Sequence, residues 1–211
     1  MKKMLLISFV MVFAVSIAFS QFGIKAGMNL GTLGGDDKTQ NGFDPKTKVG
    51  LMGGISYHIG LIAGLSVQPE VLYVQKGAIY EANLTAGNFY MNQKLTFTGG
   101  YIEIPVVARY NLPTPLVSPY IEGGLAYGFL LSAKQKEEST TNVPGEVSGT
   151  NDTDVKDQTT SSDFSIIIGI GVDILMFDVN ARYVMGQTKI GKDSDLKIYN
   201  RGIWVTAGIH F

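Results

Sequence analysis

Phe164-Ser165-Ile166-Ile167-Ile168-Gly169-Ile170-Gly171-Val172-Asp173-Ile174 alternates between two kinds of residue: every even position is apolar, and most odd positions are small or polar. Alternation with a period of two is typical of a β-strand that has one apolar face. The same pattern returns in 177–186 and in the final residues, 200–211. After residue 20 the chain has no apolar run of the ~20 residues that a membrane-spanning helix needs. The sequence therefore predicts an all-β protein.

Eight segments of this kind follow one another along the chain, at about 22–32, 48–59, 63–77, 94–110, 119–133, 163–174, 177–186 and 200–211. The connections between them alternate in length. Short ones fall near 60–62, 111–118 and 175–176, and long polar ones at 33–47, 78–93, 134–162 and 187–199. Membrane barrels have short turns on one side and long loops on the other. The pattern predicts an eight-stranded antiparallel up-and-down transmembrane β-barrel with short periplasmic turns and long extracellular loops.

The N-terminus has the three parts of a secretory signal peptide. Lys2 and Lys3 precede an apolar run from Met4 to Ala18, and Ala18-Phe19-Ser20 offers small residues at a cleavage site. This order of parts is typical of an exported protein. We therefore expect residues 1–20 to be removed and residues 21–211 to form the barrel domain.

Alternation alone does not separate a membrane barrel from a soluble, lipocalin-like one, because the two faces could be exchanged. The second face is rich in Gly, Ser and Thr, which suits a narrow interior better than a solvated exterior. Aromatic residues also gather at strand ends, where a membrane barrel meets the lipid headgroups; they are Phe22, Tyr57, Tyr110, Phe177 and Phe211. Both observations favour a barrel in outer-membrane lipid, with the lipocalin-like barrel as the less favoured alternative.

Two strand motifs resemble a known family. Ser66-Val67-Gln68-Pro69-Glu70-Val71-Leu72-Tyr73-Val74-Gln75-Lys76-Gly77 and Tyr101-Ile102-Glu103-Ile104-Pro105-Val106-Val107-Ala108-Arg109-Tyr110 are similar to the PorT-type outer-membrane β-barrel domain family, a group of small OmpA/OmpX-like barrels. The resemblance implies the fold and the bacterial outer membrane as its location. It also implies that the terminal Phe211 is the signal read by the barrel assembly machinery. It implies no activity, because the family is functionally mixed.

Several charged residues fall on the predicted inner face: Lys25, Glu70, Glu103, Arg109, Glu122, Asp173, Asp178 and Arg182. Charged groups in so confined a space need partners, so we expect an ion-pair network that fills the barrel. Counting from the short turns places Arg109 near Glu122, and Asp173 opposite Asp178. A proton or ion path through the same residues is the functional alternative.

Two further expectations concern the wall and the loops. The segment 134–162 is polar and acidic, and a segment of this composition is predicted to be a disordered external loop. Leu95 and Phe97 have the opposite parity to Ile102 and Ile104. If all four residues face lipid, a β-bulge at Gly99-Gly100 is required.

The composition disfavours most other function classes. A net charge of −1 gives no reason to expect nucleic acid as a partner. The chain has no cysteine and two histidines, His58 and His210, both near the periplasmic ends of strands. Asp152 to Asp157 begins like a calcium loop but departs from it at the fifth and sixth positions. We therefore expect no enzyme, no metal site and no cofactor. Binding or adhesion through external loops, or a structural membrane role, is the predicted function. A narrow pore for small solutes or ions is the alternative, and an enzyme in the barrel wall is less favoured.

Overall fold

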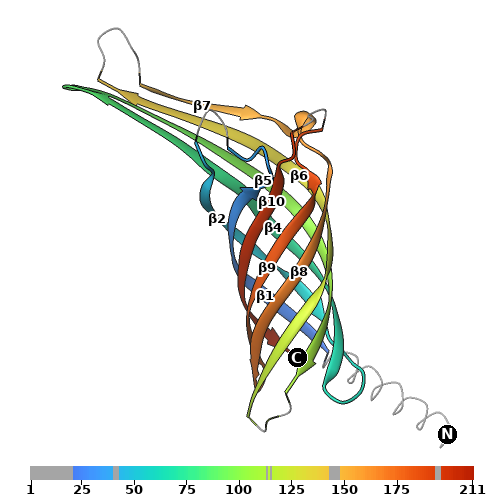
Figure 1. Ribbon diagram of the computed structural model, residues 1–211. Coiled ribbons are helices and arrows are strands. Elements are labelled where there is room, and N and C mark those ends of the chain that lie inside the picture. Colours follow the sequence, from blue (N-terminus) through green and yellow to red (C-terminus); the bar gives the residue numbers. More distant parts are fainter. Residues whose placement is uncertain (1–20, 40–42, 113, 115, 143–147, 193–195) are drawn as a thin grey trace, which may run out of the picture.

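The computed structural model describes residues 21–39, 43–112, 114, 116–142, 148–192 and 196–211 (Figure 1). The expected signal peptide, residues 1–20, lies outside the described residues. The elements are β1 (Phe22–Gly34), β2 (Lys46–Tyr57), β3 (Ile59–Gly60), β4 (Leu65–Ala86), β5 (Phe89–Asn111), β6 (Val117–Thr141), β7 (Gly149–Asp154), the 3-10 turn η1 (Lys156–Gln158), β8 (Ser162–Ile174), β9 (Phe177–Lys189) and β10 (Tyr199–His210). Within the described part of the chain, no helix has the length and apolar character needed to span a membrane.

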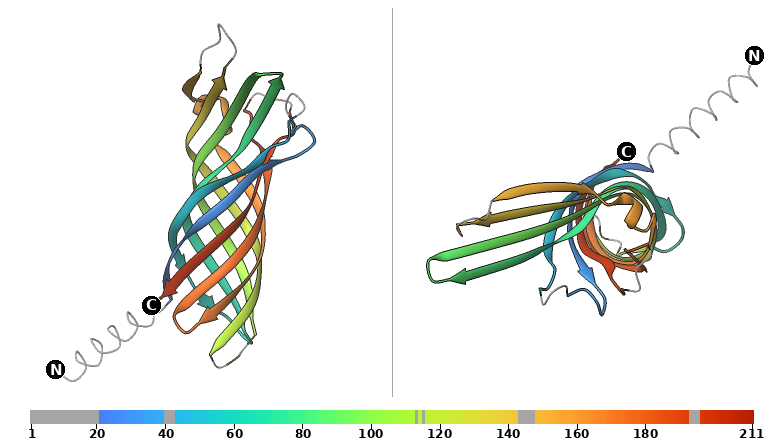
Figure 2. Two further views of the ribbon diagram at one scale, coloured as in Figure 1. Left: turned by 90° about the vertical axis from the view of Figure 1, so that its left-hand side faces the viewer. Right: turned by 90° about the horizontal axis from the view of Figure 1, so that it is seen from above.

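Eight long strands close into a ring. They pair in the order β2-β1-β10-β9-β8-β6-β5-β4, and the additional pairing of β2 with β4 closes the circle. Every pairing is antiparallel, and the view down the axis shows the closed wall (Figure 2). The C-terminus lies at the end of the barrel with the short turns (Figure 1). The predicted eight-stranded up-and-down barrel is confirmed.

The two faces of the wall differ as the alternation predicts. On β8, Ile168 and Ile170 are 53% and 64% exposed, whereas Ser165 and Ile167 between the outward positions are fully buried. Large apolar side chains are exposed in the same way on the other strands, including Leu51, Val106, Ile121 and Val179. An exposed apolar band around a closed barrel is the surface that meets lipid.

The interior is packed in layers. Along β4 the inward side chains are Glu70, Leu72, Val74 and Lys76, all buried. An apolar cluster therefore fills the middle of the barrel, between a charged layer below and another above it. Its members are Met52, Leu72, Val74, Val107, Ala126, Ile167, Val184 and Trp204. The interior of an eight-stranded barrel is narrow enough for side chains to fill it.

At the end opposite the short turns, the structure differs from the prediction of long loops. The segment 78–93 is not a loop, because β4 and β5 remain paired from Ala78–Phe97 to Ala86–Phe89. Likewise β6 continues to Thr141, and β7 pairs with it from Lys134–Asp154 to Ser139–Gly149. The predicted disorder of 134–162 is therefore wrong for these described strands. A polar composition predicts disorder for a segment that stands alone. Here β6 lies beside β5, which is already a strand, and backbone hydrogen bonds between the two keep β6 extended.

The predicted bulge at Gly99-Gly100 is also wrong. The register of β4 with β5 has no shift, and Tyr101, Glu103 and Arg109 stay buried on one face. The extra residue is in β6, where Gly100 faces Ser132 but Tyr101 faces Leu130, leaving Leu131 unpaired. Leu95 and Phe97 consequently lie on the inner face. There they pack on apolar clusters above the barrel, so lipid contact is not needed to explain their apolar character.

Candidate functional site

Six charged side chains make one network in the lower half of the barrel, which we call the lower cluster: Lys25, Glu70, Arg109, Glu122, Asp178 and Arg182. Arg182 is at its centre and is 1% exposed. Its Nη1 and Nη2 donate to Glu70 at 2.5 and 2.8 Å, and its Nε donates to Glu122 Oε1 at 2.6 Å. Bidentate arginine–carboxylate pairs of this kind fix both partners in place.

Arg109 and Lys25 connect the same carboxylates to a third one. The Nε of Arg109 donates to Glu122 Oε2 at 2.9 Å, and its guanidinium lies 4.1 Å from the ring centre of Tyr120. Lys25 Nζ is 3.2 Å from Glu70 and 3.0 Å from Asp178. Asp173 lies at the edge of this cluster, 3.9 Å from Arg109, and accepts a hydrogen bond from Asn111 at 2.7 Å.

A second, smaller network lies above the apolar layer. Lys76 Nζ is 2.7 Å from Glu103 and 2.8 Å from Asp163, and Asn200 donates to Asp163 at 2.9 Å. Glu103 was among the residues predicted from the sequence, whereas Lys76 and Asp163 were not. Parity would have identified both, since Lys76 shares the even numbering of Glu70, and Asp163 shares the odd numbering of Asp173.

The buried clusters leave little room for a solute. A hollow beside Lys76 and Trp204 has a volume of only about 10 Å³. A single water needs at least about that much. Charges that are paired across the barrel and close-packed provide a filled interior rather than an open channel.

At the short-turn end, Asp173, Asp178 and His210 offer ligand atoms within 4.8 Å of one another. Such a set could hold a metal ion if its oxygens were free. However, Asp178 already has Lys25 Nζ at 3.0 Å from one oxygen and Arg109 Nη2 at 3.4 Å from the other. Two cations so close would repel a metal ion, so the arrangement favours ion pairing within the protein.

The predicted assembly signal, Phe211, closes the ring beside the first strand. Its backbone N–H donates to the carbonyl of Phe22 at 2.8 Å, and its side chain is 59% exposed. The role of Phe211 as an assembly signal stays a prediction.

Three strands of the barrel continue beyond it and, with β7, form a projecting sheet, which we call the external sheet: residues 78–86 of β4, 89–98 of β5, 134–141 of β6 and all of β7 (Figures 1 and 2). Partly exposed ion pairs lie on the face that continues the outer wall. Lys46 is 2.7 Å from Glu81, and Lys136 is 2.9 Å from Glu138. The hydrogen bond from Lys136 lowers the pKa of Glu138, and the one from Lys46 lowers the pKa of Glu81.

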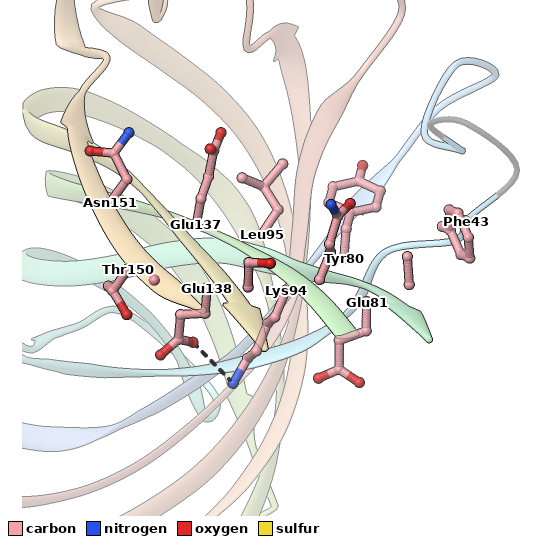
Figure 3. Close-up of a pocket in the computed structure, with 13 residues that line it drawn as sticks. Phe43, Tyr80, Glu81, Lys94, Leu95, Glu137, Glu138, Thr150 and Asn151 are labelled. Carbon is pink, nitrogen blue, oxygen red and sulfur yellow. Dashed lines mark ion pairs between the residues drawn. The ribbon is translucent and has the colours of Figure 1, made fainter. Parts of the chain in front are cut away.

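The opposite face of the external sheet, which continues the inner wall, is hollowed. The hollow has a volume of about 510 Å³ and lies over β4, β5, β6 and β7 beside Phe43 (Figure 3). Figure 3 shows Tyr80, Leu95, Glu137 and Asn151 on this face, while Lys94 and Glu138 pair on the other. The hollow was not predicted from the sequence, because loops were expected in these segments. The hollow is a candidate binding site that lies beyond the membrane wall and combines polar with apolar side chains.

The closed ring, the apolar outer surface and the filled interior together define a small integral β-barrel of the outer membrane. Residues 16–190 match the model of the "Outer membrane protein beta-barrel domain". The chain belongs to this family, as the resemblance predicted, and its location is the bacterial outer membrane.

Solved barrels of low sequence identity are similar to the chain. Ail of Yersinia pestis, solved with the heparin analogue sucrose octasulfate, is 14% identical with a TM-score of 0.40, covering 90% of this chain and 98% of that one. Neisserial surface protein A is 14% identical with a TM-score of 0.42, covering 90% and 97%. The N-terminal barrel domain of Pseudomonas aeruginosa OprF is 14% identical with a TM-score of 0.33, covering 91% and 98%. No curated protein matches the sequence significantly.

Proposed function

We propose that the protein is a surface-binding barrel, in which the transmembrane part anchors the external sheet and the sheet attaches to a partner outside the cell. The observation that carries this proposal is the continuity of strands β4, β5 and β6 from the membrane wall into the sheet. A sheet hydrogen-bonded to the barrel presents its surface at a fixed angle, so little conformational entropy is lost on binding. A purely structural membrane role is the second candidate, supported by the filled interior.

The remaining features fit this proposal. The inner charges of the lower cluster, with Glu103 and Asp173, serve to fill and stabilise the barrel rather than to conduct or catalyse. No cofactor, metal or nucleic acid is required. Residues 1–20 would direct export to the periplasm and be removed there, and the barrel assembly machinery would then read Phe211 and insert the barrel.

The proposal is tested by shortening the external sheet. Residues 80–95 and 135–153 are replaced by two-residue Asn-Gly turns, a short connection suited to antiparallel strands. The full and shortened proteins are then displayed on a non-adherent bacterium. Attachment to polysaccharide-coated surfaces and epithelial monolayers is counted. We expect the full protein to retain at least about tenfold more cells, because many weak contacts on one cell add up.

The control is the gel shift between unboiled and boiled samples, which both proteins should show because both keep a closed barrel. Equal attachment by two equally folded proteins would contradict the adhesion proposal and leave the structural role.

A further inference from the structure

The external sheet contains a trough that runs across its strands. Tyr80, Leu95, Glu137 and Asn151 are register partners and form one row on the hollowed face. The next row consists of Ala82, Gln93, Ser139 and Gly149, which are also partners in register. Because three of these four residues are small, the second row is the floor between larger neighbours. Beyond this row, Leu84 and Met91 are the next register partners on the same face.

We propose that this trough binds an uncharged oligosaccharide. The proposal rests on the function proposed above and names the chemistry of the partner. The volume of about 510 Å³ lies within the roughly 300–1,000 Å³ typical of small-ligand sites.

The polar groups suit a ligand that is rich in hydroxyl groups. Gln93 and Asn151 each offer an amide, Glu137 a carboxylate and Ser139 a hydroxyl, which together donate and accept hydrogen bonds. The backbone groups of β5 and β6 are already paired on both sides, since each strand lies between two others. A ligand crossing these strands must therefore bond to side chains. An extended peptide, which uses backbone hydrogen bonds at a sheet edge, does not fit this direction.

The apolar groups lie at one end of the trough. Tyr80 is 9% exposed, and its hydroxyl donates to the carbonyl of Lys38 at 2.7 Å, which fixes the ring. Leu95 packs beside it, and Phe43 extends the apolar surface with 37% of its area exposed (Figure 3). Sugar rings have faces of C–H groups that pack on such surfaces, while their edges carry the hydroxyls.

The charge of the trough argues against a sulfated or phosphorylated ligand. Glu137 lies in the trough, and its carboxylate accepts a hydrogen bond from the side-chain amide of Gln135 at 2.9 Å. The nearby cations Lys94 and Lys136 pair with Glu138 on the opposite face. Among the described residues no ion pair neutralises Glu137, and a carboxylate that is not neutralised repels anions.

The test uses the full mature protein in lipid nanodiscs. Maltotriose, cellotriose and chitotriose serve as uncharged probes, and a heparin-derived tetrasaccharide serves as the sulfated one. Affinity is measured by titration calorimetry. We expect at least one uncharged trisaccharide to bind and the sulfated probe not to bind.

Two variants at adjacent positions of β6 make a matched pair. Ser139→Trp fills the floor of the trough and should weaken binding at least about tenfold, because the ligand loses its space. Thr140→Trp places the same side chain on the opposite face and should leave the affinity unchanged.

Two outcomes overturn the sugar proposal: none of the uncharged probes binds, or Ser139→Trp and Thr140→Trp behave alike. The adhesion experiment remains independent of both. If shortening the sheet abolishes attachment while no probe binds, surface binding stands and the oligosaccharide is wrong. If shortening has no effect on attachment, the proposed function itself is wrong.

Discussion

Replacing Arg182 with methionine should destabilise the folded barrel by about 3–5 kcal/mol, the cost of removing one partner from a buried ion pair. Arg182 bonds to Glu70 and Glu122, whose side chains are both fully buried. Without the guanidinium, these two carboxylates remain inside the barrel and lose their closest cation. The free energy of unfolding would be measured by denaturant titration in lipid vesicles.

The control for this change is Lys136→Met on the external sheet. Lys136 also pairs with a glutamate, but its side chain is 46% exposed, and exposed pairs contribute only about 0–1 kcal/mol. If Arg182→Met prevents folding, the double variant Arg182→Met with Glu122→Gln should recover folded protein, because one buried charge is removed with its partner. A loss of stability no larger than that of Lys136→Met would show that the lower cluster does not hold the barrel together.

Replacing Ile168 with arginine should cost about 2–4 kcal/mol, the price of an arginine on the lipid face near the bilayer midplane. Ile168 is at the middle of β8 and is 53% exposed. In a soluble barrel the same position would face water, and an exposed arginine would be tolerated. The free energies of unfolding of the Ile168→Arg variant and of the unchanged protein would be compared by denaturant titration in lipid vesicles.

A second arginine on the external sheet provides the comparison. Thr140→Arg lies on an exposed position of β6 beyond the membrane wall and should change the stability by less than about 0.5 kcal/mol. Equal effects of the two arginines would place Ile168 in water and contradict the membrane barrel.

The barrel could be predicted from the sequence because its two faces meet different surroundings. Lipid outside and packed side chains inside impose a strict alternation, as in β8. The number of alternating segments therefore predicts the number of strands. The pairing of Arg109 with Glu122, at 2.9 Å, follows from counting residues away from a short turn.

The external sheet could not be predicted in the same way. Beyond the membrane, neither face needs to be apolar, so Gln93, Lys94, Glu137 and Glu138 carry no alternating signal. The extra residue Leu131 shifts the parity of β6 where the wall passes into this sheet. The change from odd to even apolar positions after Leu95 does not mark a bulge in β5. Leu95 is apolar because it packs inside the barrel mouth rather than against lipid.

The central claim is that the external sheet lies outside the cell and the short turns lie in the periplasm. The chain has no cysteine, so single cysteines report cleanly on their own positions. Leu84, at the end of the external sheet, and Ile62, in a short turn, are 61% and 78% exposed. Each is replaced by cysteine and treated on intact cells with a membrane-impermeant maleimide. We predict that Leu84→Cys is labelled on intact cells and that Ile62→Cys is labelled only after the outer membrane is permeabilised. Labelling of Ile62→Cys on intact cells, with Leu84→Cys protected, would contradict the account.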